Sequence, residues 1–193
     1  MGLDMYLTVD YDLSAYDFRR EQAKKDKEVA KEIAVFESIV GLMGIESKDL
    51  PECNSISMDI QVGYWRKANA IHNWFVNNVQ NGDDDCEKYY VSREQIEELA
   101  ALCERIVEGI DFGEVVMEGP EPWSYETYPN LTFSGEVKDL IIEELPPQGG
   151  FFFGPTDLGA WYATYVKDTA EMLRKLLNMP ELEGYDFHYQ SSW

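Results

Sequence analysis

The chain has 193 residues, of which 45% are hydrophobic and 13% aromatic, and this composition excludes disorder over the whole chain. Lys and Arg together number 16 against 37 Asp and Glu, which gives a net charge of −21. A surface of this sign repels phosphate backbones and attracts basic surfaces. We therefore expect no direct nucleic-acid binding, and a partner protein with a basic surface.

The first residues, Met1–Met5, lack the basic and apolar regions of a secretory signal, and no apolar run is long enough to span a membrane. The three cysteines, Cys53, Cys86 and Cys103, have no CxxC spacing, which is typical of a reducing compartment. We expect a cytoplasmic protein that does not contact the membrane. The length predicts a single compact domain over residues 1–193, with an irregular acidic elaboration at about 109–149.

In the first part of the chain, apolar residues alternate loosely over Leu3–Val9, which predicts a strand. Apolar residues at helical spacing then predict one long helix over Phe18–Leu42, and a polar loop follows at Glu46–Asn54. Alternation over Ser55–Val62 predicts a half-buried strand, and a second helix is expected over Trp65–Val79.

A short strand is expected at Lys88–Val91, and Ser92 with Gln95 forms the capping box of a helix that extends to Val107. Helical spacing disappears over Gly109–Gly150, where five prolines interrupt the chain. The strands expected within this stretch are Val115–Met117, Leu131–Phe133 and Lys138–Ile142.

The last part of the chain begins with a predicted buried strand at Phe151–Phe153. Thr156 is expected to cap a helix that extends to Leu177, and Tyr185–Tyr189 alternates as an edge strand does. Together these elements predict an α+β fold, with a small mixed or antiparallel sheet and about four helices mainly on one face.

The predicted helix Trp65–Val79 carries the densest run of residue types that bind ligands. On a helix, Arg66, Asn69 and Asn73 would share one face, and an Arg near a helix start suits an anionic group. The alternative is a solvated face, although Asn is a poor helix former. The candidate ligand-binding residues are Arg66, Lys67, Asn69, His72 and Asn73.

Two residues of this helix have open interpretations. His72 is one of only two histidines, so imidazole catalysis would use it or His188. It lies at the edge of the apolar stripe, however, which favours a partly buried structural histidine. Trp74 lies away from the stripe and either packs under another element or is exposed for a partner.

Clustered carboxylates at Asp83, Asp84, Asp85 and Glu87 invite a metal interpretation, because Ca²⁺ and Mg²⁺ prefer such oxygen ligands. The calcium-loop pattern fails, since Gly and the terminal Glu are missing at the required offsets, and the cysteines and histidines have no zinc spacing. We therefore expect no metal and no cofactor. A solvated acidic turn is favoured instead. We take these four carboxylates, together with Trp74, as candidate partner-binding residues.

Four segments carry a resemblance to a known family: MGLDMYL at the start, YWRKANAIH from Tyr64 to His72, the stretch from Asp85 to Gln95, and GFFFG from Gly150 to Gly154. The chain resembles a family of small uncharacterised bacteriophage and bacterial proteins. This resemblance implies a phage or mobile-element origin. The family has no established activity, so it assigns no role to any residue. The chain departs from the pattern in Ala15–Gly41 and around Gly109–Leu140.

Two classes of function follow. Between residues 83 and 144 there are 18 acidic residues against four basic ones, which suits an acidic protein-binding inhibitor that mimics nucleic acid and blocks a host nucleic-acid-handling protein, as anti-defence or anti-CRISPR proteins do. The alternative interpretation of such a surface is solubility alone. The second class is a small enzyme, or a protein that sequesters a nucleotide-like ligand through the Trp65–Val79 helix. No nucleophile motif and no phosphate-binding Gly-rich loop supports it.

Overall fold

The computed structural model describes residues 2–45, 54–122 and 124–193. These residues pack into two compact units, whereas the chain length predicted one compact domain. The larger unit combines the chain up to Val9 with Gln61–Trp193, and the smaller one is Asp10–Ile60. Two long strands, β1 (Asp4–Ser14) and β2 (Ser55–Arg66), have one end in each unit. Strand β1 covers the predicted strand Leu3–Val9 from Asp4 onward, β2 contains the predicted Ser55–Val62, and both extend further along the chain.

The main sheet has four antiparallel strands in the order β2-β1-β8-β3, with β3 at Tyr89–Val91 and β8 at Phe187–Ser192. The register of β1 and β8 pairs Asp4 with Ser192 and Val9 with Phe187. The prediction of an edge strand near Tyr189 is therefore wrong, because β8 lies between β1 and β3. Its side chains Phe187 and Tyr189 are fully buried, as an interior strand requires.

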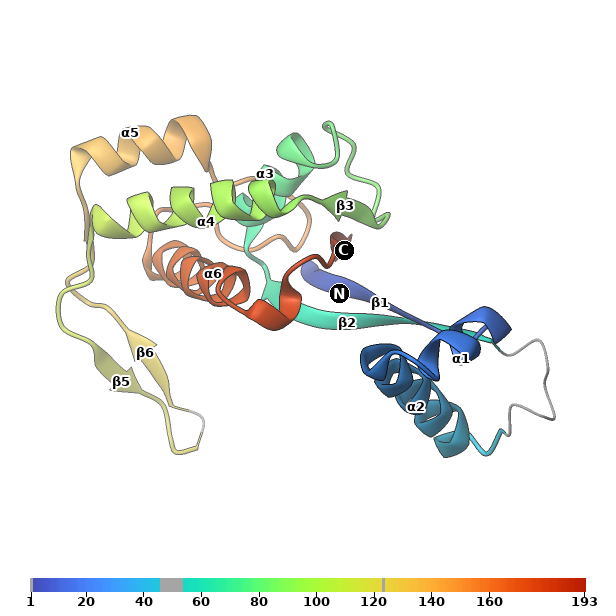
Figure 1. The fold of residues 1–193 in the computed structure, drawn as a ribbon. Helices are drawn as coiled ribbons and strands as arrows, with labels where there is room; N and C mark the ends of the chain where they lie inside the picture. The colour runs from blue at the N-terminus through green and yellow to red at the C-terminus, as the bar shows by residue number, and fades with distance from the viewer. Residues whose placement is uncertain (1, 46–53, 123) are drawn as a thin grey trace. The chain divides into compact units, whose positions relative to one another are not determined.

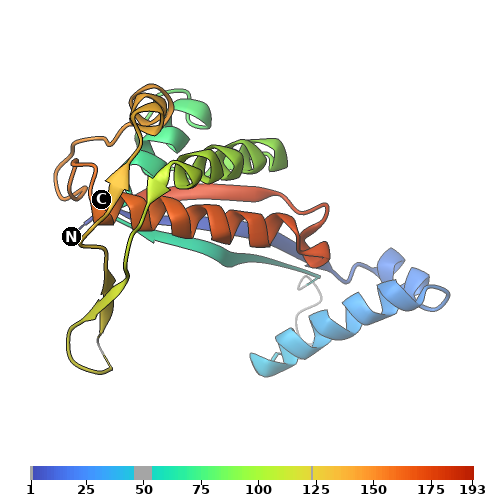
Figure 2. The ribbon, with the colours of Figure 1, turned by 90° about the vertical axis from the view of Figure 1, so that its left-hand side faces the viewer.

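The core of the larger unit lies on one face of this sheet. The β1 side chains Met5, Leu7 and Val9 are buried in it, together with Leu3 just before the strand. Three helices contribute the other side of the core: α3 (Asn69–Asn78), α4 (Arg93–Glu108) and α6 (Ala160–Leu177). Helices α4 and α6 lie side by side (Figures 1 and 2). The predicted α+β class is thus confirmed.

Helix α4 begins where its sequence predicted. The Ser92 hydroxyl accepts a hydrogen bond from the Gln95 N–H at 3.1 Å, and the Gln95 side chain accepts one from the Ser92 N–H at 2.9 Å. This capping box satisfies two N–H groups that the first helical turn leaves without partners. Its apolar residues at helical spacing, from Ile96 to Ile106, are buried.

Helix α3, by contrast, starts later than predicted. The backbone from Tyr64 to Arg66 continues β2, and Lys67 then takes a positive φ of 56°, which a helix does not allow. The prediction that Arg66 shares a helix face with Asn69 and Asn73 is therefore wrong. After α3, Asn81 and Gly82 both have positive φ, as a left-handed helix end requires.

The stretch expected as an irregular elaboration contains regular structure. The short strands are β4 (Ile110–Asp111), paired with β7 (Thr132–Phe133), and β5 (Val116–Glu118), paired with β6 (Tyr125–Thr127). Helix α5 (Gly135–Glu144) stands where the sequence analysis placed the strand Lys138–Ile142, so that prediction is wrong. Ser134 caps α5 by accepting from the Val137 N–H at 3.2 Å, and Val137 and Ile141 are buried together on one helix face.

The predicted buried strand Phe151–Phe153 is also wrong. This segment is a turn in which Phe151 is 84% exposed, and only Phe153 enters the core. Helix α6 begins after Gly159 rather than at Thr156, and a 3₁₀ turn, η1 (Pro180–Leu182), precedes β8.

The smaller unit holds the two helices α1 (Asp17–Ala23) and α2 (Lys27–Leu42), where the sequence predicted one. The break arises at Asp26, whose carboxylate accepts from the Glu28 N–H at 3.0 Å and starts the second helix. The small core of this unit contains Leu13, Ala15, Phe36 and Val40. The polar loop predicted at Glu46–Asn54 lies, apart from Asn54, outside the described residues. Among the described helices, none is long and apolar enough to cross a membrane.

Candidate functional site

The candidate residues of α3 turn mainly inward. The buried Asn69 side chain donates to the Phe153 and Pro155 carbonyl oxygens at 3.3 and 2.8 Å, and its own oxygen accepts from the Gln148 N–H at 3.2 Å. Both donors and one lone pair of the amide are thus used by the loop before α6. Asn69 fixes this loop and offers little to an external ligand.

The buried His72 is the centre of a polar network. Its Nδ1 lies 2.7 Å from the Tyr189 hydroxyl, and its Nε2 lies 3.1 Å from an oxygen of Asp84. A carboxylate only accepts, so Nε2 carries the proton, and Nδ1 of the neutral ring accepts from the tyrosine. Burial lowers the pKa of His72, and the neighbouring Asp84 only partly opposes this effect. The ring is therefore neutral, with both nitrogens occupied.

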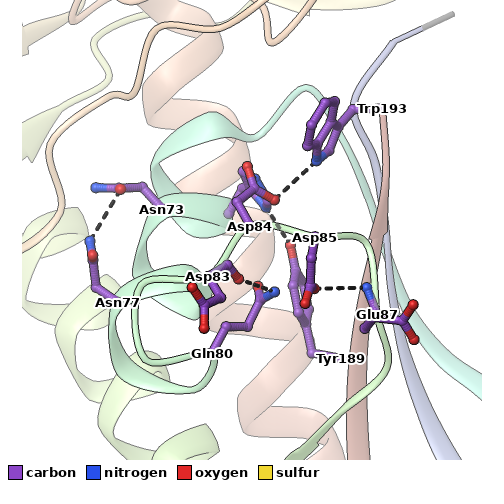
Figure 3. A network of polar contacts seen from close by, with 10 residues as sticks. Asn73, Asn77, Gln80, Asp83, Asp84, Asp85, Glu87, Tyr189 and Trp193 are labelled. Carbon is purple, nitrogen blue, oxygen red and sulfur yellow. Dashed lines mark hydrogen bonds and ion pairs between the residues drawn. The ribbon is translucent and has the colours of Figure 1, made fainter.

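The network continues from Asp84 to the last residue of the chain. The second carboxylate oxygen of Asp84 accepts from the Trp193 indole N–H at 3.0 Å. Tyr189 stacks on Phe75 with ring centroids 3.9 Å apart, and burial raises its pKa well above the ordinary value. The network thus joins α3, the acidic turn after it and the end of β8 (Figure 3).

The acidic turn, residues 83–87, is stabilised by hydrogen bonds to its own carboxylates and backbone. Asp85 accepts from the Glu87 N–H at 3.0 Å and from the Tyr89 hydroxyl at 2.8 Å, and these bonds lower the pKa of Asp85. The same contact raises the pKa of Tyr89 to about 12. Asp83 contributes its backbone carbonyl, which accepts from Gln80 at 2.9 Å. Within the described ranges, no group of three or more His, Cys, Asp or Glu is placed to hold a metal ion.

The remaining candidates do not converge on α3. Arg66 is 59% exposed on β2 and forms a loose ion pair with Asp4 at 3.8 Å. The Lys67 carbonyl accepts from the Trp161 indole N–H at 3.2 Å. On the solvent side of α3, Asn73 accepts from Asn77 at 3.1 Å. The five proposed ligand residues therefore do not line one site.

The structure decides between the alternatives for Trp74. The side chain is buried, with 6% exposed, and its ring packs edge-on against Phe75 with centroids 5.4 Å apart. Because the indole lies in the core, it is not displayed to a partner.

A second group of carboxylates stands on α4 and α5. Of the 18 acidic residues between 83 and 144, all but the half-buried Glu104 are exposed. Helices α4 and α5 are joined by an ion pair between Arg105 and Glu144 at 3.1 Å. We define the α4–α5 acidic face by the exposed residues Glu94, Glu98, Glu108, Glu136, Asp139 and Glu143. The sequence showed that this part of the chain is acidic. Because it predicted a strand at Lys138–Ile142, it did not show that the acidic residues lie on two neighbouring helices.

The opposite side of α4 is tied to α6. Arg174 donates to Glu97 at 2.7 Å and to both oxygens of Glu104, at 2.8 and 2.7 Å. These bonds lower the pKa of Glu104. The carboxylates of Glu97 and Glu104 therefore stabilise helix packing, whereas those of the α4–α5 acidic face are turned to solvent.

The chemistry available to the His72 network is limited. Both ring nitrogens are bound to other side chains, so neither is open for proton transfer to a substrate. Burial raises the pKa of the Cys103 thiol, which disfavours the nucleophilic thiolate. The geometry fits a role in holding the acidic turn in place. Comparison with protein-family models, with curated proteins and with solved structures gave no match.

Proposed function

We propose that this protein binds a partner protein with a basic surface, and that it does so through the α4–α5 acidic face. The single observation that carries this proposal is the set of exposed carboxylates on two helices that are fixed against the core by Ile96, Ile106 and Ile141. A rigid scaffold presents charges in a constant arrangement, which favours specific recognition.

Folding alone gives no reason for this arrangement. Like charges four residues apart on one helix, such as Glu94 and Glu98, destabilise the helix by about 0.2–0.5 kcal/mol. Solubility of a small domain needs a net charge of only about 2–8 in magnitude, and the chain carries −21. An excess that costs stability and exceeds the need for solubility is best explained by a basic partner.

The partner class follows from the charge. Basic surfaces on proteins commonly serve nucleic acids, so carboxylates on a rigid face can occupy a site built for phosphates. The proposed role is that of an accessory protein of a phage or mobile element, as the sequence resemblance implies, that inhibits a nucleic-acid-handling protein of the host. The competing ligand-binding role of α3 is less well supported, because Asn69 and His72 already bind other parts of the chain.

The experiment is affinity capture from a bacterial host lysate, identification of the retained protein, and measurement of its Kd at increasing salt. Four carboxylates of the acidic face are neutralised together in Glu94→Gln, Glu98→Gln, Asp139→Asn and Glu143→Gln. The matched control makes the same change in net charge elsewhere, in Glu171→Gln, Glu181→Gln, Glu183→Gln and Asp186→Asn.

We expect the Kd of the wild type to weaken steeply with salt, because the contacts are between exposed charges. The acidic-face variant should bind about tenfold or more weakly, and the control should stay close to wild type. Both variants should unfold within about 0.5 kcal/mol per substitution of the wild type. Binding that is insensitive to salt, or equal losses in the two variants, would contradict the proposal.

A further inference from the structure

A small pocket lies in the larger unit, between the end of β2 and the first half of α6. Its volume is about 190 Å³. Trp65 lines it from β2, and Trp161, Tyr165 and Asp168 line it from α6. Their spacing on α6 places these three residues on one helix face. Because β2 is an edge strand of the described sheet, the pocket stands at the margin of the core.

The two indoles offer the pocket carbon surface and π electrons. The Trp65 N–H donates to the Thr169 hydroxyl at 2.8 Å, and the Trp161 N–H donates to the Lys67 carbonyl at 3.2 Å. Both polar hydrogens are thus used within the protein. Aromatic rings with their N–H groups engaged elsewhere attract cations through the negative face of the ring.

Two further side chains with oxygen atoms line the pocket, those of Asp168 and Tyr165. The Asp168 carboxylate forms no hydrogen bond or ion pair with any residue in the described part of the chain. The Tyr165 side chain is 93% buried, and its hydroxyl makes no hydrogen bond of normal geometry with the described residues, although the Ala70 N–H approaches it.

The pocket lining carries one charge of each sign, on Arg66 and on Asp168. The Arg66 guanidinium forms an ion pair with Asp4 at 3.8 Å, and Asp4 also accepts a hydrogen bond from the Tyr64 hydroxyl. The Asp168 carboxylate has no ion-pair partner in contact among the described residues, although the neighbouring Lys167 acts on it. Burial raises the pKa of Asp168, the nearby Glu171 and Glu126 raise it further, and Lys167 opposes this effect, so a bound cation would relieve the remaining unfavourable charge.

We infer that this pocket binds an organic cation, namely a guanidinium or alkylammonium group, with Asp168 as its countercharge and Trp65 and Trp161 as aromatic walls. The volume is below the roughly 300–1,000 Å³ of pockets for drug-sized ligands, so the pocket fits one side chain or one small free cation. The inference goes beyond the acidic-face proposal, because its residues lie on β2 and α6 rather than on α4 and α5.

The test uses n-butylguanidinium as the probe and n-butylurea as its neutral analogue of the same shape. Binding is followed by NMR of the indole N–H groups, with the Trp65 and Trp161 signals assigned through Trp→Phe variants. We expect n-butylguanidinium to shift these two signals in a saturable way and n-butylurea to leave them unchanged. Asp168→Asn should weaken the Kd about tenfold or more, because a hydrogen bond between two charged groups is lost.

Asp186→Asn is the matched control, since it removes one exposed carboxylate that lies outside both the pocket lining and the α4–α5 acidic face, and it should leave the Kd unchanged. Trp161→Leu provides a second variant on a half-exposed residue and should weaken the Kd about 3- to 30-fold through loss of the cation–π contact. The inference is overturned if n-butylurea shifts the same signals equally, if neither probe shifts them, or if Asp168→Asn and Asp186→Asn behave alike.

A blocked Gly-Arg-Gly peptide separates the two sources of such a cation. If the pocket receives a side chain from a partner, the peptide should bind at least as tightly as n-butylguanidinium. If it receives a free small cation, the flanking glycines should weaken binding. If none of these probes binds but the acidic-face variant still loses its partner, the cation pocket is rejected and the proposed function stands.

Discussion

The acidic turn after α3 and the α4–α5 acidic face contain the same residue types in very different settings. In the turn, the carboxylates of Asp84 and Asp85 accept hydrogen bonds from His72, Trp193 and Tyr89. On the face, Glu94 and Asp139 are exposed to solvent. A run of acidic residues therefore does not by itself identify a binding surface. Replacing a carboxylate that accepts hydrogen bonds within the protein should lower its stability. Carboxylates that are exposed to solvent remain available to a partner.

The largest effect is expected from His72→Leu. The substitution leaves the buried Tyr189 hydroxyl and the Asp84 carboxylate without their partner, which should lower the free energy of unfolding by about 2–4 kcal/mol. The control is Asn73→Ala on the solvent side of the same helix, with an expected change within about 0.5 kcal/mol. Urea denaturation measures both. Equal losses in the two variants would show that the network does not stabilise the fold.

A smaller effect is expected from Asp84→Asn, which keeps the shape of the side chain but removes its charge. The hydrogen bonds from His72 and Trp193 lose their charged acceptor, so the variant should lose about 1–2 kcal/mol. Asp83→Asn is the paired variant, because Asp83 holds the turn through its backbone carbonyl. It should unfold like the wild type in thermal and urea denaturation. If Asp83→Asn lowers the free energy of unfolding as much as Asp84→Asn does, the two carboxylates do not differ in their contribution to stability.

The smallest effect is a dependence on pH. The pKa of buried His72 lies below its ordinary value of 6.5, so the unfolded chain takes up the proton first as the pH falls. The contribution of His72 is therefore complete above pH 6.5 and decreases toward the lower folded pKa, by up to about 1.4 kcal/mol per pH unit. Asp84, which faces the ring together with the Tyr189 hydroxyl, limits this loss.

Unfolding measured between pH 7.5 and 5 should show this decrease in the wild type and not in His72→Gln. His188→Gln changes the other of the two histidines and should keep the dependence. The window ends above the range in which Asp85 and Glu104 take up protons, because both have lowered pKa values. A His72→Gln variant that loses stability with the wild-type slope would assign the dependence to another group.

Local sequence signals predicted the elements whose determinants lie within a few residues. The capping box of Ser92 and Gln95 fixed the start of α4, and strict alternation indicated β2. The failures arose where long-range packing outweighs propensity. The branched residues of Lys138–Ile142 favour a strand, yet the Ser134 cap and burial of one face make this segment helical. The aromatic run Phe151–Phe153 suggested a core strand, although a turn exposes its first two rings.

The candidate site was only partly accessible to the same reasoning. His72 stood out because histidine is rare in this chain, and its place at the edge of an apolar stripe indicated a structural role. Its partners could not be found in this way. Asp84 lies in the turn that follows α3. Tyr189, however, comes 117 residues after His72, and Trp193 comes 109 residues after Asp84, and only the pairing of β8 with its neighbours brings these two residues to the turn and α3.

The position of β8 inside the main sheet also bears on how the protein is made. Among the strands of this sheet β8 is synthesised last, yet it pairs with β1, the first of them to be synthesised, so that Asp4 meets Ser192. While the ribosome is still adding residues before Phe187, the inner edges of β1 and β3 have no strand between them. Such edges attract other chains, and contacts between distant residues form slowly. The nascent chain therefore passes through a stage open to aggregation, and it is during this stage that chaperones should bind it most strongly.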